Sequence, residues 1–171
     1  MNKKTRNLTL SALFASLTVI SLYIASVWPT GLFGLVAFAS LFGTATVIEA
    51  GLAPGIYVYL VSSMLSMLII PNRAAPLLFI FFFGYYPVVK SLIERIRLII
   101  IQWALKLLLF NLSLTVIWFF FRGLILNFGD KAPNLIFIYL GGSIVFALFD
   151  YGYTKIIWLY INRISKYTRR K

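Results

Sequence analysis

The sequence predicts an all-α fold: a polytopic membrane protein built as a bundle of six transmembrane helices. Of its 171 residues, 61% are hydrophobic and only 12% are charged, whereas soluble domains average about 45–50% apolar and 25% charged residues. Uncharged stretches run from Asn7 to Ile48 and from Ala50 to Asn72. Because a helix needs about 20 such residues to cross the hydrocarbon core of a bilayer, lipid must surround much of this chain.

Six segments have the length and apolarity of a membrane span. We expect these helices at about 8–28, 32–49, 56–70, 77–96, 98–121 and 135–160. Turn-forming residues lie between most of them: Pro29-Thr30-Gly31, Gly51 to Gly55, residues 71–76 and residues 127–134. Pro87 lies inside the fourth segment and predicts a kink that frees the carbonyl of Phe83. Since no linker or composition break occurs, we expect one transmembrane domain over 1–171.

The distribution of basic residues predicts the orientation. The two tails carry eight of the sixteen lysines and arginines: Lys3, Lys4, Arg6, Arg163, Lys166, Arg169, Arg170 and Lys171. The positive-inside rule places both tails in the cytoplasm, which requires an even number of spans. Six spans also put Lys90, Arg95 and Arg97 inside, and the prolines at 29, 71, 76 and 133 in outer connections. We therefore expect a multi-pass protein of the cell membrane with both termini cytoplasmic.

The composition also excludes several kinds of chemistry. Cysteine and histidine are absent, and the four carboxylates are Glu49, Glu94, Asp130 and Asp150. The chain therefore lacks a thiol nucleophile, a thiolate or imidazole metal site, and histidine as the commonest general base. We expect a protein that is not an enzyme and holds no cofactor or metal. The net charge of +12 fits contact with anionic lipid head groups better than nucleic-acid binding.

Five ionisable side chains fall within the predicted spans, where each costs about 2.5–3.5 kcal/mol on insertion scales. They are Glu49, Lys90, Glu94, Lys106 and Asp150. The topology places all five toward the cytoplasmic half, where three acids and two lysines can neutralise one another in a buried charge network. Lys90 and Glu94 share one helix face because they are four residues apart. The alternative is that Glu49, Lys90 and Glu94 lie in the interfacial layer, with Lys90 snorkelling to the head groups.

A second group of polar and aromatic residues falls in the outer half and forms a candidate substrate-binding site. Its members are Asn72, Arg73, Asn111, Trp118, Arg122 and Tyr139. Aromatic rings beside an arginine and amide groups suit a planar, polar or anionic small molecule. The alternative is an aromatic belt, because Trp and Tyr gather at both membrane interfaces.

Small residues lie close together on the first predicted helix. Ser11 with Ala15, and Ala12 with Ser16, each give the small-x-x-x-small spacing that lets helix backbones approach closely in lipid. This pattern predicts either a docking surface for another membrane subunit or packing inside the bundle.

The chain resembles the substrate-binding S components of energy-coupling factor (ECF) transporters. The similar features are its size, its six spans, the basic start Met1 to Arg6 and the alanine-bearing segment Leu10 to Ser16. That family docks its membrane coupling subunit through an Ala-x-x-x-Ala motif on the first helix. Here the alanines are Ala12 and Ala15, and a four-residue spacing is met only by pairing Ser with Ala.

The resemblance implies a function and a set of partners. It implies uptake of a vitamin-like micronutrient, bound near the outer face, with a transmembrane coupling subunit and two ATPase subunits as partners. The lack of a Gly-rich phosphate loop in this chain fits that division of labour, since ATP is then handled elsewhere. The competing class is a non-transport membrane scaffold or morphogenesis factor of similar size, which needs no ligand.

Overall fold

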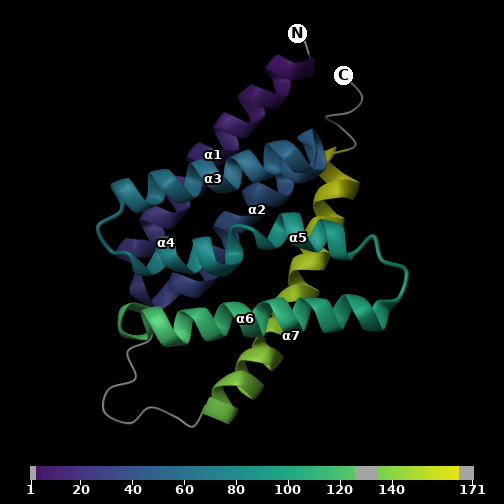
Figure 1. Ribbon diagram of the computed structural model, residues 1–171. Coiled ribbons are helices and arrows are strands. Elements are labelled where there is room, and N and C mark those ends of the chain that lie inside the picture. Colours follow the sequence, from purple (N-terminus) through teal and green to yellow (C-terminus); the bar gives the residue numbers. More distant parts are fainter. Residues whose placement is uncertain (1–2, 126–134, 166–171) are drawn as a thin grey trace.

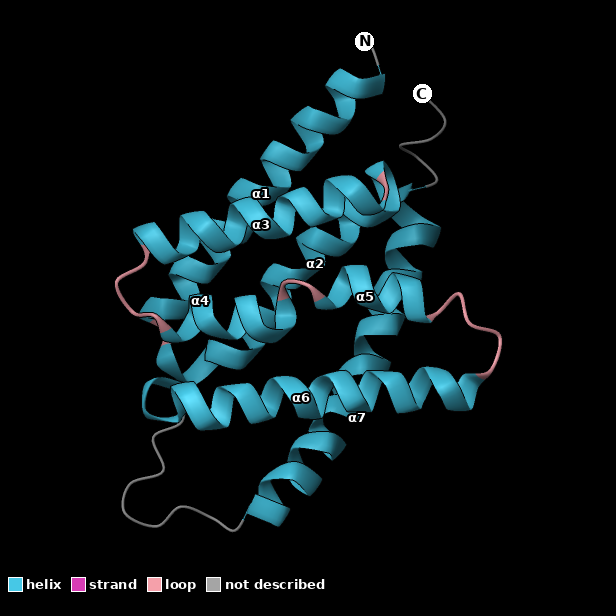
Figure 2. Cartoon of the chain, viewed as in Figure 1, coloured by secondary structure: helices cyan, strands magenta, loops and turns pink. Residues whose placement is uncertain are grey.

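The computed structural model describes residues 3–125 and 135–165, without the side chains of residues 3, 29, 121–125, 135, 164 and 165. Every regular element in these ranges is a helix, which confirms the all-α class. The order is α1 (Lys3–Val27), the 3-10 turn η1 (Pro29–Gly31), α2 (Leu32–Ala50), α3 (Leu52–Ile69), α4 (Ala74–Leu78), the π-helical η2 (Phe79–Phe83), α5 (Tyr86–Ile93), α6 (Ile99–Ile125), α7 (Leu135–Tyr160) and the π-helical η3 (Ile161–Ser165) (Figures 1 and 2).

Six helical stretches of the described chain are long and apolar enough to cross a membrane. They are Lys4–Val27, Leu32–Ala50, Leu52–Ile69, Ala74–Ile93, Ile99–Phe120 and Ile136–Arg163. Many of their large apolar side chains face outward; Leu68 and Ile100, for example, are 78% and 80% exposed. Such a surface is suited to lipid rather than to water, so the chain is a multi-pass membrane protein.

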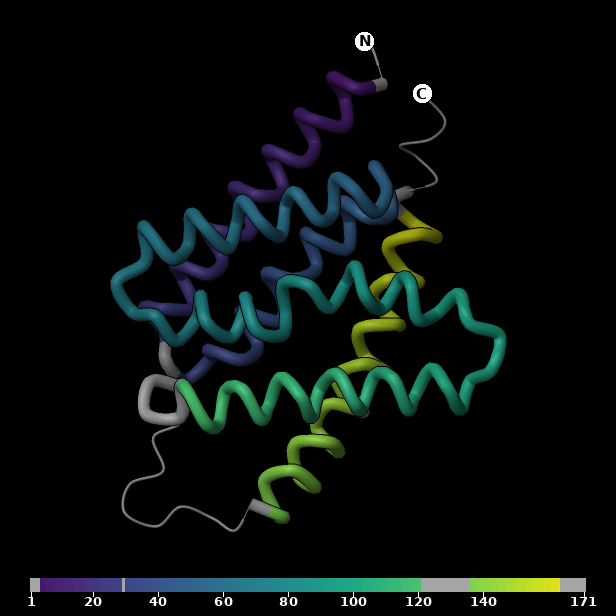
Figure 3. The backbone as a smooth tube through the Cα atoms, in the orientation of Figure 1, coloured from purple at the N-terminus to yellow at the C-terminus, as the bar shows by residue number. Residues whose placement is uncertain are grey.

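The helices run back and forth, so their connections gather at two ends of the bundle (Figures 1 and 3). One end, called the proline end below, holds η1, the α3–α4 connection, the end of α6 and the start of α7. The opposite end, called the terminal end, holds the start of α1, the α2–α3 junction, the α5–α6 connection and η3. The start of α1 and the end of η3 lie at the same end, as an even number of spans requires.

The junction between α2 and α3 is tighter than the turn expected over 51–55. Gly51 alone separates the two helices, with a φ of +104° that favours glycine. Pro54 then falls in the first turn of α3, where the missing N–H breaks no helical hydrogen bond. A Cβ on Gly55 would lie 2.4 Å from Cγ2 of Val47, so this glycine lets α3 pack closely against α2.

The fourth span is interrupted rather than continuous over the expected 77–96. The N–H of Gly84 donates to the carbonyl of Phe79 and closes the π-helical turn, after which Gly84 and Tyr85 break the helix (Figure 2). Pro87 therefore sits in the first turn of α5 and needs no intrahelical donor. This span supplies much of the bundle's core, including Phe79, Phe82 and the fully buried Tyr86.

Candidate functional site

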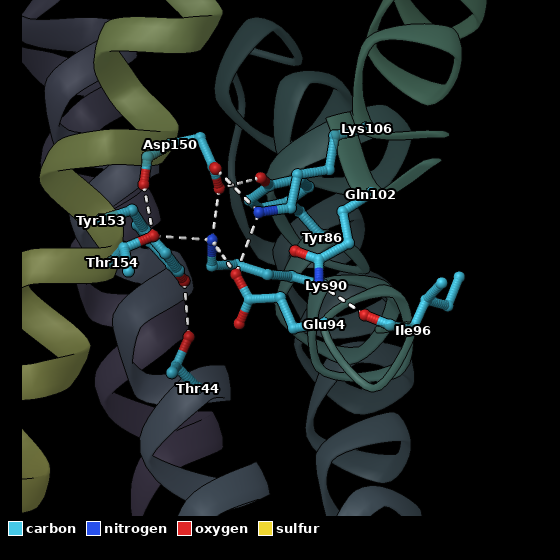
Figure 4. Close-up of polar contacts among 10 residues, drawn as sticks. All are labelled: Thr44, Tyr86, Lys90, Glu94, Ile96, Gln102, Lys106, Asp150, Tyr153 and Thr154. Atoms are coloured by element: carbon cyan, nitrogen blue, oxygen red, sulfur yellow. Dashed lines mark hydrogen bonds and ion pairs between the residues drawn. The ribbon is translucent and has the colours of Figure 1, made fainter. Parts of the chain in front are cut away.

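Four charged side chains form a closed ion quartet in the half of the bundle nearer the terminal end (Figure 4). Its members are Lys90 on α5, Glu94 at the end of α5, Lys106 on α6 and Asp150 on α7. Nζ of Lys90 pairs with Oδ1 of Asp150 and lies 2.7 Å from Oε1 of Glu94. Nζ of Lys106 lies 2.9 Å from the same Glu94 oxygen and 2.8 Å from Oδ2 of Asp150.

The quartet is neutral and largely shielded from solvent. Lys90 and Asp150 are only 1% and 2% exposed, and Lys106 is 5% exposed, whereas the Glu94 side chain is 38% exposed. Lys90 also donates to Oγ1 of Thr154 at 2.9 Å. Buried charges are tolerated when they are paired and their remaining hydrogen bonds are made. The quartet meets that condition and ties α5, α6 and α7 together.

The local sequence explains how these groups meet. Tyr86, Lys90 and Glu94 follow one another at four-residue spacing, so they line one face of α5 as it runs into its C-cap. The Tyr86 hydroxyl donates to Asp150 Oδ1. In the connection that follows, Gln102 Nε2 donates to the carbonyl of Ile96 at 2.7 Å and holds the start of α6 in place.

Glu49, the fifth residue of the expected network, makes no ion pair with the quartet. It lies in the last turn of α2, and its Oε1 is buried without a hydrogen-bond partner among the described residues. A different contact joins α2 to α7 nearby. The hydroxyl of Tyr153 lies 2.6 Å from Oγ1 of Thr44 and 3.0 Å from Oγ of Ser40.

A pocket of about 440 Å³ lies in the half of the bundle nearer the proline end. This volume falls within the range of small-molecule sites, about 300–1,000 Å³. Its walls come from α2, α4, η2, α6 and α7. The lining residues are Phe33, Gly34, Ala37, Leu78, Phe82, Phe83, Phe110, Ser113, Leu114, Ile117, Ile138, Gly142, Val145, Phe146 and Phe149.

Aromatic rings form the floor of this pocket and separate it from the quartet. This aromatic floor consists of Phe82, Phe83, Phe146 and Phe149, with Tyr86 packed against it. The ring centroids of Phe82 and Phe146 are 5.8 Å apart, and those of Phe83 and Phe149 are 5.4 Å apart. Phe146 of the floor lies four residues, about one turn, before Asp150, so the pocket and the quartet lie on successive turns of α7.

Ser113 supplies the one polar side chain that lines the pocket within the described part of the chain. It is 3% exposed. Its Oγ donates to the carbonyl of Leu109 at 2.8 Å and also meets the hydroxyl of Tyr85. Because Ser113 donates its hydroxyl proton to the carbonyl of Leu109, the Tyr85 hydroxyl must be the donor in the second contact. One lone pair of the Ser113 oxygen then remains to accept a hydrogen bond.

Of the six residues expected to bind substrate, the five whose side chains are described are not among the residues that line this pocket. Oδ1 of Asn72 accepts from the N–H of Ala74 at 3.1 Å, and Arg73 donates to the carbonyl of Met67, so both close the α3–α4 connection. The Tyr139 hydroxyl lies 2.7 Å from Oγ1 of Thr115, which joins α7 to α6.

The other three expected substrate-binding residues lie on α6. Asn111 donates to the carbonyl of Leu107 at 2.8 Å and contacts Ser143 at 3.5 Å. Trp118 is buried, 6% exposed, and follows the lining residue Ile117. The side chain of Arg122, one turn later, lies outside the described part of the structure.

The small residues of α1 point in different directions. Ala15 is buried, and its carbonyl accepts a hydrogen bond of 3.4 Å from Ser62 of α3. Ala12 and Ser16 are exposed, while Ser11 is half-buried. The Ser11/Ala15 pair therefore turns toward the bundle, and the Ala12/Ser16 pair remains accessible on its surface.

Comparisons with protein-family models, with curated proteins and with solved structures gave no match to this chain.

Proposed function

We propose that this chain is the substrate-binding membrane subunit of an uptake transporter for a small, vitamin-like molecule, energised by separate ATPase subunits. The observation that carries the proposal is the 440 Å³ pocket in the half of the bundle nearer the proline end. Such concave, mostly apolar cavities within helix bundles are the usual setting of small-molecule sites.

The position of the pocket suits capture rather than conduction. On its terminal side, the pocket is bounded by the aromatic floor, and the closed ion quartet follows beyond it. With the basic tails in the cytoplasm, the pocket lies in the outer half of the membrane, where an uptake protein first meets its substrate. Release on the other side then needs a change of conformation, which supports a role for a coupling subunit and for ATP hydrolysis by partners.

The proposal is tested by measuring which component of the growth medium the cells take up. A strain that lacks the gene is compared with strains expressing the wild-type chain, Gly34→Trp or Gly141→Trp, and the medium is analysed by mass spectrometry. A Cβ on either glycine would meet nothing within 4 Å, so both variants are expected to fold. Only Gly34 lines the pocket.

We expect the wild type and Gly141→Trp to deplete the same medium component and Gly34→Trp to leave it in place. If no component is depleted by any strain while loss of the gene alters cell shape, the uptake function is wrong. The scaffold function then stands in its place.

A further inference from the structure

We infer that the ligand of the pocket is a neutral, mainly apolar molecule with at most one hydrogen-bond donor, and that it reaches the pocket from the lipid between α2 and α7. This inference rests on the proposed binding function and names the class of ligand. It differs from the polar or anionic ligand that the sequence favoured.

The described residues that line the pocket provide no charge to a ligand. Six of these fifteen residues are phenylalanines, and none of the fifteen is ionisable. Within the described part of the chain, the buried cations are Lys90 and Lys106 of the quartet. Lys90 already meets Asp150, Glu94 and Thr154, and Lys106 meets both acids. An anionic ligand would therefore find no counter-ion among the described lining residues of this apolar cavity, which is strongly unfavourable.

The shape of the lining favours flat groups. Phe110 and Phe146 stack with centroids 4.7 Å apart and an interplanar angle of 11°, and Phe82 meets Phe110 edge to face at 5.4 Å. A Cβ on Gly142 would lie 3.3 Å from the Phe110 ring, so this glycine lets α7 approach the stack closely. Aromatic surfaces of this kind accept another ring or a planar unsaturated group.

The single polar feature limits the hydrogen bonding of the ligand. Ser113 has one acceptor position left after its bonds to Leu109 and Tyr85. A ligand with one O–H or N–H can satisfy that position. Each further donor or acceptor would be buried without a side-chain partner among the described lining residues, at a cost of about 1–3 kcal/mol.

Part of the described pocket lining is exposed on the lipid-facing surface of α2 and α7. Phe33 on α2 and Val145 on α7 line it and are nevertheless 52% and 65% exposed, and Gly34 has open space where a side chain would stand. The hydrogen bonds of Tyr153 that join α7 to α2 lie farther toward the terminal end. An apolar molecule dissolved in the bilayer can therefore move sideways into the pocket.

Photolabelling of the full chain in phospholipid nanodiscs tests both parts of the inference. The probes are benzophenone, 4-hydroxybenzophenone and 4-benzoylbenzoate, which share one ring system and differ in a single substituent. Adducts are mapped by mass spectrometry and normalised to adducts on Leu68, a lipid-facing residue outside the pocket. The wild type is compared with Gly34→Leu, Gly34→Trp and the control Gly141→Trp.

We expect both neutral probes to label lining residues of α2, α6 and α7. The anionic probe should label them roughly 10- to 100-fold less, because its carboxylate must lose its water. The Gly34 variants should lose these adducts and Gly141→Trp should keep them. Equal labelling by 4-benzoylbenzoate overturns the neutral class, and unchanged labelling of Gly34→Trp overturns lateral access.

These outcomes separate the ligand class from the uptake function. Lining adducts without depletion of any medium component would reject uptake and leave the ligand class in place. Depletion of a charged component, with no adducts from the neutral probes, would reject the ligand class and leave uptake in place.

Discussion

The Tyr86 hydroxyl donates a hydrogen bond to Oδ1 of Asp150, while the ring of the same tyrosine packs against the floor of the pocket. Its centroid lies 5.2 Å from that of Phe82 and 5.8 Å from that of Phe146. Because the ring and the hydroxyl move as one rigid group, a ligand that displaces the floor also displaces a hydrogen bond to the quartet. Tyr86 thus links the apolar pocket to the charged groups nearer the terminal end.

Replacing Tyr86 by Phe tests the strength of that link. The ring stays and the donor to a buried carboxylate is lost, so we expect the free energy of unfolding to fall by about 1.5–3 kcal/mol. The measurement is equilibrium unfolding in mixed micelles titrated with sodium dodecyl sulfate. Tyr153→Phe is the matched control. It removes a hydroxyl whose hydrogen-bond partners in the described part of the chain are the neutral side chains of Ser40 and Thr44, so it should cost about 0.5–1.5 kcal/mol. Equal losses would show that the charge of Asp150 adds nothing.

The second prediction concerns the balance of charge in the quartet. Asp150→Asn leaves Lys90 and Lys106 with Glu94 as their one carboxylate, so we expect a loss of about 3–5 kcal/mol in unfolding free energy. The double variant Lys106→Met with Asp150→Asn keeps the Lys90–Glu94 pair and restores neutrality. It should therefore be more stable than Asp150→Asn alone. If the double variant is the less stable of the two, the quartet is not held together by charge balance.

Much of the fold follows directly from the sequence. Apolar run length and the position of the breakers predict all six helices, because in lipid every backbone polar group must be satisfied within its helix. The ends are less predictable. α3 begins at Leu52 rather than near 56, because Gly51 alone makes the turn and Pro54 is tolerated in the first helical turn.

The candidate site, like the fold, could be predicted from the sequence only in part. The four-residue spacing of Lys90 and Glu94 and the need to neutralise Lys106 and Asp150 indicate a charged cluster, and the structure places these four residues together. The pocket gives no such signal. Its phenylalanines look like lipid-facing ones in the sequence, and only the interruption at Gly84 and Tyr85 and the close approach at Gly142 determine which of them enclose a cavity.

The third prediction concerns the orientation of the bundle. Single cysteines can replace Lys3, Lys131 and Lys171, since the chain has no cysteine of its own. We expect an impermeant thiol reagent applied to intact cells to label position 131 alone, because the positive-inside rule predicts that the basic tails stay in the cytoplasm. Permeabilised cells provide the control, in which all three positions should react. Labelling of either tail in intact cells would place the pocket on the cytoplasmic side and contradict capture from outside.

The last prediction separates packing from docking on α1. Ala15 is buried against α3, so Ala15→Leu adds three carbon atoms where space is already filled and should destabilise the chain by about 1–3 kcal/mol. Ala12 and Ser16 are exposed on the other small-x-x-x-small pair. Ala12→Leu and Ser16→Leu should therefore leave the free energy of unfolding within about 0.5 kcal/mol of the wild type.

If the exposed pair docks a coupling subunit, these two variants should lose the partner on co-purification while they remain folded. A larger side chain would hold apart two helix backbones that small residues allow to approach in lipid. Leu13→Ala is the matched control, because Leu13 is exposed on the same helix outside this pair. Retention of the partner by both Ala12→Leu and Ser16→Leu would assign docking to another surface. The small residues of α1 would then serve only the contact that Ala15 makes inside the bundle.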